Sequence, residues 1–286
     1  MNKASFLLLN VLIVAFFSCK TDVKNSDPNR PQGFQPGDPA SPTVLAGHWI
    51  NLDFCARASQ YGSVLQTMNN SHLPYAFAFS FNPGNPDSVT CYNAREIWTL
   101  PVKYKQDTLE VVGAAAGKSV FLIYHSQGDK DMTMFDNTGG RTRMDNFIKS
   151  RAGTKDGYVA FTTALNHHVF NGEFTPIGKG ATAKVSFTPG GFLQGMKDFD
   201  RYEICTGGDC FVAGQEMDVV TFYNAKKGKE ASEKMFGYHY NGGNDTLSIF
   251  NLIPAKPAGE ATAKVGTVAY KYLRTISMPA IAKPKK

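Results

Sequence analysis

Alternating apolar and polar positions recur along most of the chain between residues 46 and 276. In the run YAFAFSFN, Phe77, Phe79 and Phe81 take alternate positions, and small residues lie between them. Because successive side chains of a strand point to opposite faces of a sheet, this run predicts a strand with one aromatic face. Further strands are predicted in SVTCYN, IWTLPVKY, TLEVVGA, SVFLIYHS, MTMFDN, YVAFTTAL, EFTPI, AKVSFT, RYEICT, DVVTFYN, MFGYHYN, TLSIFNLI and VAYKYLRT.

Turn-forming stretches such as NPGNPD, TPGG and NGGND separate these runs at short intervals. Many short strands with few helices between them are typical of an antiparallel sandwich or barrel. A stretch of about 230 residues can bury a sizeable core and still form one all-β domain. The predicted fold class is therefore all-β, with a single antiparallel β-barrel over residues 46–276.

One segment, ASQYGSVLQTMNN, follows a helical period instead. Its apolar residues at helical spacing are Tyr61, Val64, Leu65 and Met68. The pattern predicts one short helix soon after the first strand, with Ser59 capping its start. A second short helix is predicted from Asp145 through Arg151.

The first 18 residues predict a secretory signal peptide. Lys3 supplies a positive start, and residues 6–17 are almost wholly apolar. Ser18 directly before Cys19 favours cleavage there and acylation of the cysteine, as in bacterial lipoproteins, although the two phenylalanines before Ser18 depart from the usual signal. Acyl chains on Cys19 would hold the protein on a membrane. An ordinary secreted protein is the alternative.

The residues around the predicted domain are polar and rich in Pro, Asp, Asn, Ser and Gly. Residues 19–45 are expected to form a flexible tether, and residues 277–286 a disordered tail. No aspartate directly follows Cys19, which favours the outer membrane over the inner membrane. The expected location is the bacterial cell envelope.

The chain carries a formal charge of +6, of which the signal peptide contributes one lysine, so the mature chain carries +5. That charge is mild, and an exported protein does not meet nucleic acid in its usual setting, so nucleic acid is not an expected partner. The densest basic stretch, RTRMDNFIKSRAGTK, is interpreted as a solvated loop. We expect a monomer.

Four cysteines remain besides Cys19, and export favours their oxidation. Cys205 and Cys210 flank the tight turn CTGGDC and are a candidate disulfide. Cys55 and Cys91 would form a second bridge or remain buried thiols, and three pairings are open in all. No CxxC occurs, and the His167-His168 pair lacks a partner at metal-ligand spacing, so neither a metal site nor a cofactor is expected.

Two features at the ends of the domain point to a known architecture. The first strand begins Gly47-His48-Trp49, and Arg274 lies on the last predicted strand. This arrangement resembles the lipocalin and wider calycin superfamily, in which a Gly-x-Trp signature packs its Trp at the closed end of an up-and-down barrel and a late arginine lies across the ring. Gly47 would allow the close approach, and the Arg274 guanidinium would stack on the indole.

The resemblance implies the carriage or sensing of a small apolar ligand inside a calycin-like barrel. The family's second motif, Thr-Asp-Tyr, is absent, and the domain is longer than a typical lipocalin. The candidate ligand-binding residues are Phe77, Phe79, Phe81, Trp98, Phe222 and Tyr270. Each of these aromatic residues can equally be part of a packed core, and the sequence leaves that choice open.

Two other functions remain open. A surface module would grip carbohydrate or protein with exposed aromatics such as Tyr92, Trp98 and Tyr238. An enzyme would place a nucleophile or a carboxylate pair inside the barrel, with Cys55 as one candidate nucleophile. Carboxylates such as Asp53, Glu96 and Glu203 could form such a pair, which the sequence does not show. No GxSxG, HExxH or P-loop motif occurs, so no catalytic residue is predicted and a binding protein is the favoured interpretation.

Two weaker patterns complete the sequence. VTCYNAR at residues 89–95 and VTFYNAK at 220–226 echo each other, which we interpret as the reuse of strand and turn chemistry rather than as a duplication. Asp-Ser/Thr-aliphatic tripeptides centred on Ser88, Thr108 and Thr246 match an O-glycosylation signal of exported proteins in some Gram-negative lineages. Such tripeptides are also ordinary turn-to-strand chemistry.

Overall fold

The computed structural model describes residues 39–275, apart from 71–72, 95, 116, 127–130, 138–141, 178–182, 208–216, 242, 244 and 254–263. The predicted signal peptide, Cys19 and the C-terminal tail lie outside these residues. The elements are α1 Pro42–Leu45, β1 Gly47–Asn51, α2 Leu52–Tyr61, α3 Val64–Asn70, β2 Ala78–Phe81, β3 Ser88–Tyr92, β4 Ile97–Lys105, β5 Thr108–Ala115, β6 Lys118–His125, β7 Asp131–Asp136, β8 Arg143–Lys149, α4 Gly157–Val169, β9 Gly172–Pro176, β10 Val185–Phe187, β11 Leu193–Gln194, β12 Arg201–Ile204, β13 Asp218–Tyr223, α5 Lys229–Ser232, β14 Lys234–Tyr240, β15 Thr246–Ile253 and β16 Lys264–Arg274.

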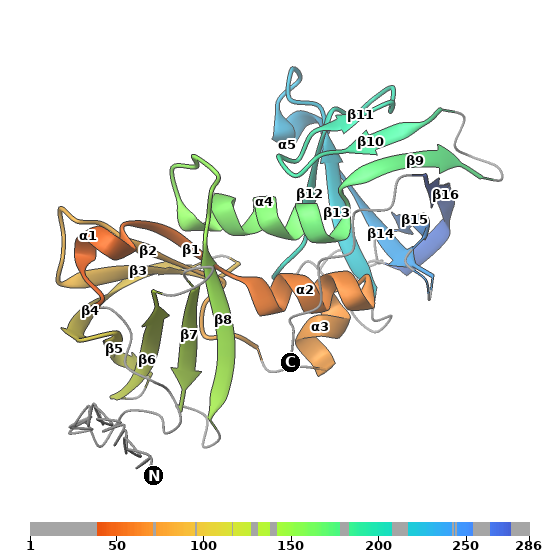
Figure 1. Cartoon of the computed structure of the whole chain (residues 1–286). Helices are drawn as coiled ribbons and strands as arrows, with labels where there is room; N and C mark the ends of the chain where they lie inside the picture. Colours follow the sequence, from red (N-terminus) through yellow and green to blue (C-terminus); the bar gives the residue numbers. More distant parts are fainter. Residues whose placement is uncertain are drawn as a thin grey trace, which may run out of the picture. The chain divides into compact units, whose positions relative to one another are not determined.

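The first eight strands form a closed antiparallel barrel in chain order, because β1 pairs with β2 on one side and with β8 on the other (Figure 1). The Cα partners of Trp49 are Phe79 on β2 and Lys149 on β8. Buried side chains of its core include Trp49, Phe79, Phe81, Val89, Leu109, Leu122, Met134 and Phe147. The predicted antiparallel β-barrel is therefore confirmed.

The second half of the chain forms another antiparallel sheet of eight strands, in the order β11-β10-β9-β16-β15-β14-β13-β12. Its two edges meet: the Leu193 amide donates to the Asp200 carbonyl at 2.9 Å, and the Tyr202 amide donates to the Gly191 carbonyl at 2.9 Å. A bridge between Phe192 and Arg201 lies beside these bonds. The strands thus follow the same circular order as those of the barrel.

The structure differs here from the single barrel expected over residues 46–276. Eight strands suffice to close a barrel, and the eighth strand ends at Lys149. A second core joins the outer face of the barrel to the other sheet through two helices. It contains Ile50 and Tyr92 from the barrel, Phe54 and Phe161 from the helices, and Phe174, Phe187, Phe222 and Phe236 from the second sheet.

The single helix predicted after the first strand is two helices. The Asn51 side chain caps α2 by accepting from the Phe54 amide at 2.9 Å, so the cap is Asn51 and not Ser59. Gly62 ends α2 in the left-handed region, at φ 64°. Glycine is suited to that conformation, and α3 begins two residues later in a new direction.

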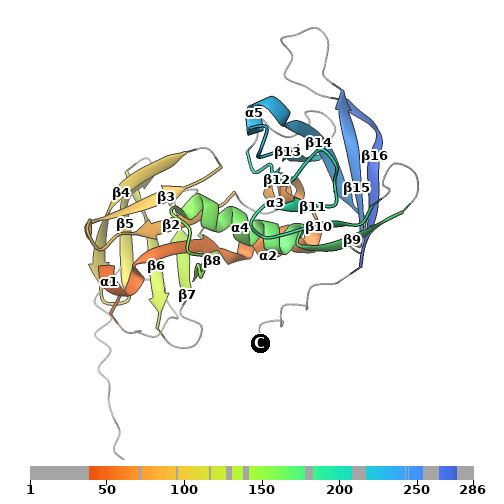
Figure 2. The same cartoon turned by 90° about the horizontal axis from the view of Figure 1, so that it is seen from above.

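The segment YVAFTTAL, predicted as a strand, belongs to helix α4. Asp156 caps α4 by accepting from the Val159 amide at 2.8 Å. The buried residues Phe161, Leu165 and Val169 then recur at every fourth position, which is a helical period. Figure 2 shows α4 beside α2. A Cβ at Gly157 would lie 2.7 Å from the Tyr92 ring, so glycine permits the close approach of α4 to the barrel.

The helix predicted from Asp145 through Arg151 is also wrong, because residues 143–149 form strand β8. Asp145 and Phe147 are buried on this strand. Asp145 accepts a hydrogen bond from Arg57 of α2 at 3.0 Å. Pairing with both β7 and β1 outweighs the local helical preference, since this strand closes the barrel.

The Gly-x-Trp signature lies at the start of β1 as predicted, but its cationic partner is Lys149 rather than Arg274. The Lys149 ammonium lies 6.0 Å from the Trp49 ring centroid. A Cβ at Gly47 would lie 3.3 Å from Lys149 Cε, and Gly47 has φ +113°, so both space and backbone conformation favour glycine.

Arg274 instead belongs to the second sheet. Its guanidinium lies 5.1 Å from the Phe174 ring and 5.2 Å from the Tyr240 ring. It also donates to the Val169 carbonyl at 2.6 Å. The last strand of the chain meets β9 and not β1, which is why Arg274 cannot contact Trp49.

Candidate ligand-binding cavities

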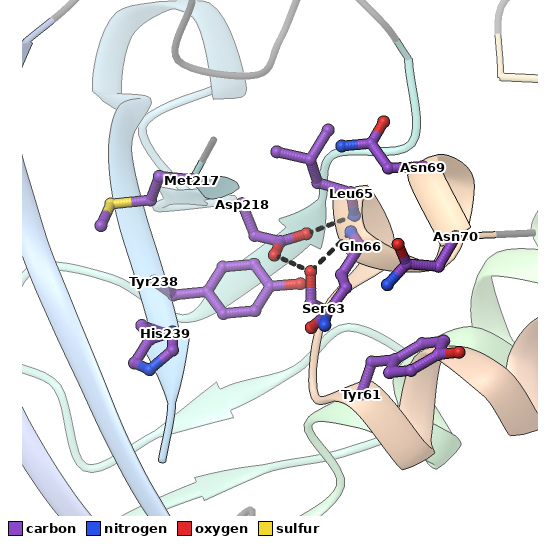
Figure 3. Close-up of a pocket in the computed structure, with 10 residues that line it drawn as sticks. All are labelled: Tyr61, Ser63, Leu65, Gln66, Asn69, Asn70, Met217, Asp218, Tyr238 and His239. Atoms are coloured by element: carbon purple, nitrogen blue, oxygen red, sulfur yellow. Dashed lines mark hydrogen bonds between the residues drawn. The ribbon is translucent and has the colours of Figure 1, made fainter. Parts of the chain in front are cut away.

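Two cavities of the described structure share helix α3. The first, called the polar cavity, has a volume of about 450 Å³. It is lined by Tyr61, Ser63, Leu65, Gln66, Asn69, Asn70, Met217, Asp218, Tyr238 and His239 (Figure 3). The second, called the apolar cavity, has a volume of about 360 Å³. It is lined by Met68, Leu73, Pro74, Tyr75, Phe77, Asn93, Ala94, Glu96, Thr206 and Gly207.

Asp218 is the centre of the polar cavity. Its carboxylate accepts hydrogen bonds from the Ser63 hydroxyl and, at 2.8 Å, from the Leu65 amide (Figure 3). Burial raises the pKa of Asp218 above its usual value, and these hydrogen bonds oppose that shift. Ser63 in turn accepts from the Gln66 amide at 2.9 Å. Asp218 therefore fastens the first turn of α3 to the second sheet.

Tyr238 reaches from β14 toward the same carboxylate (Figure 3). Its side chain is 1% exposed, and its hydroxyl lies within hydrogen-bonding reach of the Asp218 carboxylate. Burial, and then the neighbouring charge of Asp218, raise the pKa of Tyr238 well above its usual value. Tyr238 thus joins Ser63 and the backbone of α3 among the hydrogen-bond donors around Asp218.

Two rigidly held aromatic side chains form a wall of the apolar cavity. Tyr75 donates to the Ala114 carbonyl at 3.0 Å and accepts from the Trp98 indole at 3.2 Å. Phe77 stacks on Phe161 of α4, with 4.6 Å between ring centroids. These contacts fix both rings before any ligand arrives.

Polar groups occupy another part of the apolar cavity. The Asn93 amide nitrogen donates to the Glu96 carboxylate at 3.2 Å. The hydroxyls of Thr206 and Tyr158 are hydrogen-bonded at 3.0 Å. Leu73 is 54% exposed, so an apolar side chain lies on the side of the cavity that faces solvent. Apolar walls with a few polar groups are typical of small-molecule sites.

The predicted ligand-binding residues fall into two different cores of the described structure. Phe79 and Phe81 belong to the barrel core, and Phe222 belongs to the core of the second sheet. Trp98 is half-buried against Tyr75, and Tyr270 stacks on Tyr272 at 6.3 Å. Of the six, only Phe77 lines either described cavity. It precedes β2 and faces the helices rather than sharing the core of Phe79 and Phe81.

The exposed aromatics of the surface-module hypothesis are mostly buried. Tyr92 is 6% exposed and Tyr238 is 1% exposed, while Trp98 is half-buried. Tyr92 packs where α4 approaches the barrel, and Tyr238 faces Asp218. Neither ring presents a face to a large ligand.

The cysteines have structural surroundings. Cys55 and Cys91 are free thiols in two different buried cores, so they do not form the second bridge. Burial raises the pKa of Cys55 strongly and raises that of Cys91 to about 12, which keeps both protonated. Cys205 is disulfide-bonded, and Cys210 lies outside the described residues. The Cys205–Cys210 pairing stays a prediction.

The candidate carboxylates lie apart from one another. Asp53 accepts from the Asn146 backbone and side chain at 2.9 and 3.0 Å. Glu203 pairs with Lys229, and Glu96 lies at the apolar cavity. Within the described ranges, no three His, Cys, Asp or Glu side chains gather as a metal site would require.

The candidate glycosylation sites differ in exposure. Thr108 is 6% exposed, and its hydroxyl donates to Asp107 at 3.1 Å, so the folded protein does not present it. Ser88 and Thr246 are partly exposed and stay predictions. The acylation of Cys19 also stays a prediction. In the part of the chain that the structure describes, no helix has the length and apolar character needed to cross a bilayer.

Sequence reasoning missed the residues at the centre of the polar cavity. Ser63 and Gln66 show the spacing of a helix N-terminus, Ser-x-x-Gln, which could have located the start of α3. Asp218 lies 155 residues from Ser63, and no local signal connects them.

Comparisons of the chain with protein-family models, with curated proteins and with solved structures found no match.

Proposed function

We propose that this protein is a lipid-anchored protein of the bacterial envelope that binds a small amphipathic molecule. The apolar cavity carries this proposal. It combines fixed Tyr75 and Phe77 rings with the polar groups of Asn93, Glu96 and Thr206. Its volume of about 360 Å³ falls in the usual range for small-ligand pockets.

The driving force would be burial of apolar ligand surface, at about 25 cal/mol per Å². Because Tyr75 and Phe77 are already held by other contacts, binding would not need to order them. The polar groups would then orient the ligand. The site differs from the expected one in position, since it lies beside α3 and not among Phe79, Phe81 and their neighbours.

We also propose membership of the lipocalin and calycin superfamily. The support is Gly47-x-Trp49 on the first strand of a closed eight-stranded barrel, with a cationic side chain from the last barrel strand near the indole. Lys149 takes the place that the resemblance assigns to an arginine. Anchoring through Cys19 would then hold the barrel near a membrane, where amphipathic molecules are concentrated.

The experiment is native mass spectrometry of the full chain carrying Cys19→Ser, purified without detergent from the periplasm of a host. We expect an extra mass that leaves on unfolding and extracts into organic solvent. A bare polypeptide that takes up neither fatty acids nor lysolipids would contradict the proposal.

A matched pair of variants tests the location. Leu73→Asp places a charge at the exposed edge of the apolar cavity and should reduce uptake at least about tenfold, since a charge opposes apolar burial. Met144→Asp makes a similar change at a residue that is 49% exposed on β8 and lines neither cavity. Equal uptake by both variants would place the site elsewhere.

A further inference from the structure

One face of helix α3 presents three side-chain amides to the polar cavity. Gln66, Asn69 and Asn70 are three and four residues apart, so their side chains are neighbours on the helix surface (Figure 3). All three residues are exposed, and none of their side chains forms a hydrogen bond with a described residue. Each side-chain amide offers two N–H donors and an acceptor oxygen. This face of α3 therefore has hydrogen-bonding capacity available for a ligand.

Other contacts hold α3 in place, so these amides are not needed to fasten the helix. Asp218 accepts hydrogen bonds from the Ser63 hydroxyl and from the Leu65 amide, and the Val64 amide and Tyr238 also donate to it. These bonds fix the first turn of the helix. The amides of the following turn are therefore preorganised, which lowers the entropy cost of binding a ligand.

The charges of the lining favour a neutral ligand. Among the ten described lining residues, Asp218 is the only acidic one, and none is lysine or arginine. The carboxylate opposes the entry of anions such as phosphates. Its hydrogen-bond donors already compensate its burial, so it does not require a cation. A neutral molecule that both donates and accepts hydrogen bonds matches this lining.

Apolar surface lies among the polar groups of the cavity. The Tyr61 ring, Leu65 and Met217 line it together with the amides. A sugar ring combines hydroxyl groups, which donate and accept hydrogen bonds, with C–H groups that can pack against an aromatic ring. The cavity volume of about 450 Å³ falls in the usual range for small-ligand sites. Its composition and size therefore suit a saccharide.

We propose that the polar cavity is a binding site for a neutral saccharide. The side-chain amides of Gln66, Asn69 and Asn70 donate to and accept from the hydroxyl groups of the sugar. The Tyr61 ring packs against C–H groups of the sugar ring, and Asp218 acts as a positioning residue that holds α3. This site is separate from the apolar cavity, and the inference does not rest on the proposed function.

The contrasting explanation is that the three amides only keep the outer face of α3 hydrated. Hydration alone predicts no saturable response to sugars at this cavity. A binding site predicts a saturable response that is lost when the amides are removed. Because alanine is favoured at exposed helix positions, alanine variants of Gln66 and Asn69 should keep the fold and can separate the two explanations.

The test is an NMR titration of the full chain carrying Cys19→Ser with methyl glucoside, methyl galactoside and N-acetylglucosamine. We expect at least one of these neutral sugars to shift the backbone amides of Leu65 and His239 saturably, with a dissociation constant of about 1 mM. Glucuronate is the anionic counterpart. It should bind at least about tenfold more weakly than the best neutral sugar, because Asp218 opposes its carboxylate.

Variants of the cavity should weaken binding in proportion to the contacts they remove. Gln66→Ala and Asn69→Ala should each weaken it about fivefold, and the double variant at least about tenfold. Tyr61→Leu should weaken binding, whereas Tyr61→Phe keeps the ring and should retain most of it. Gln194→Ala removes an exposed side-chain amide on β11, outside both cavities, and should change nothing. Leu73→Asp should also leave sugar binding unchanged, which separates this site from the apolar cavity.

The absence of a saturable shift with all three neutral sugars up to about 10 mM, ten times the expected dissociation constant, would overturn the proposal. So would sugar binding that survives the double variant of Gln66 and Asn69. Binding of glucuronate as tightly as the best neutral sugar would likewise contradict it. Uptake of an amphipathic molecule in the apolar cavity is measured separately, so either site can fail without the other.

Discussion

The closed barrel and the second sheet use the same order of eight antiparallel strands but close it differently. In the barrel, β1 and β8 are joined by three registered residue pairs. In the second sheet, β11 has two residues and meets β12 through one bridge and neighbouring backbone bonds. The core of the second sheet also receives Phe170, which follows α4 directly. Short strands are thus tolerated where a helix end helps to fill the interior.

The two regions share a structural device at the start of each first strand. Gly47 and Trp49 on β1 correspond to Gly172 and Phe174 on β9, and both glycines have positive φ, at +113° and +137°. Gly47 pairs with Phe81, and Gly172 pairs with Phe187. Each glycine therefore opposes a phenylalanine on the next strand of its sheet.

A cation on the last strand completes the device in both regions. Trp49 pairs with Lys149, and Phe174 pairs with Arg274, so each last strand brings a cation to the aromatic residue of the first. Lys149 donates to the Val44 carbonyl at 3.3 Å, and Arg274 donates to the Val169 carbonyl at 2.6 Å. Val44 and Val169 lie in the last turns of α1 and α4, where carbonyls lack helical partners.

The two versions divide the hydrogen bonding differently. Trp49 itself donates to the Leu45 carbonyl at 2.7 Å, so Lys149 can remain exposed. Phe174 has no donor, and Arg274 makes the bond and covers the ring together. In the barrel, the aromatic residue makes its own hydrogen bond to the helix and the lysine only lies near its ring. In the second sheet, the aromatic residue is apolar and the arginine makes the hydrogen bond to the helix. We therefore expect substitutions at equivalent positions of the two regions to lower the free energy of unfolding by unequal amounts.

Removing the aromatic residues should have the largest effect. Trp49→Ala and Phe174→Ala each empty a fully buried position and should lower the free energy of unfolding by about 3–5 kcal/mol. Trp49→Ala should cost more, because it also leaves the Leu45 carbonyl unpaired. Urea unfolding followed by circular dichroism measures both. Leu273→Ala, at an exposed position on β16, is the control and should have little effect.

Removing Arg274 should have the next largest effect. Arg274→Met deletes hydrogen bonds to the Val169 carbonyl and the Tyr240 hydroxyl in a partly buried site, and should cost about 2–3 kcal/mol. Lys271→Met on the same strand, at an exposed position, should be near neutral. Similar unfolding midpoints for the two variants would show that Arg274 does not cap α4.

Acid should act on the region of α4 through His168. Burial, and then the charge of His167, lower the pKa of His168 from 6.5 to about 4. The folded state therefore favours the neutral ring, so this stability is complete above pH 6.5 and is lost as the pH falls toward 4. The loss at pH 5 should be about 2 kcal/mol.

Urea unfolding between pH 7.5 and pH 5 measures this loss of unfolding free energy. His168→Gln should flatten the decline, whereas His167→Gln, at an exposed neighbour, should keep it. A decline that His168→Gln leaves unchanged would assign the acid sensitivity to another group.

Removing Lys149 should have the smallest effect. Its side chain is exposed, and its bond to Val44 is long at 3.3 Å, so Lys149→Met should cost less than about 1 kcal/mol. A loss equal to that of Arg274→Met, in the same urea assay, would contradict the unequal division of hydrogen bonding between the two regions.

The repeated device was not found in the sequence, although its elements are visible there. Gly172-Glu173-Phe174 has the spacing of Gly47-His48-Trp49, and 125 residues separate the equivalents in all three pairs, including Lys149 and Arg274. The second copy has phenylalanine in place of tryptophan, so the Gly-x-Trp signature does not match it. The VTCYNAR and VTFYNAK echo instead joins β3 with β13, the third strand of the barrel with the fifth of the second sheet, so it does not mark equivalent positions.

Local chemistry was enough to determine much of the secondary structure. Alternation placed β2, β6 and β14, the Gly-x-Trp signature placed β1, and an antiparallel barrel followed from the number of strands. These features depend on neighbouring residues, whose preferences act over two to four positions. The same reasoning failed at α4, a helix with aromatic residues, and at β8, a strand with many polar residues. Both elements contact partners far along the chain.

Only the tertiary structure decided where the barrel closes, which cation meets Trp49, and that Asp218 meets Ser63. Each of these depends on contacts between distant segments: Trp49 pairs with Lys149, and Ser63 lies 155 residues from Asp218. The register of β8 against β1 selects the cation that meets Trp49. Composition and periodicity do not encode that choice locally. The cavities on the two sides of α3 follow from it, because they form only where both halves of the chain contribute side chains.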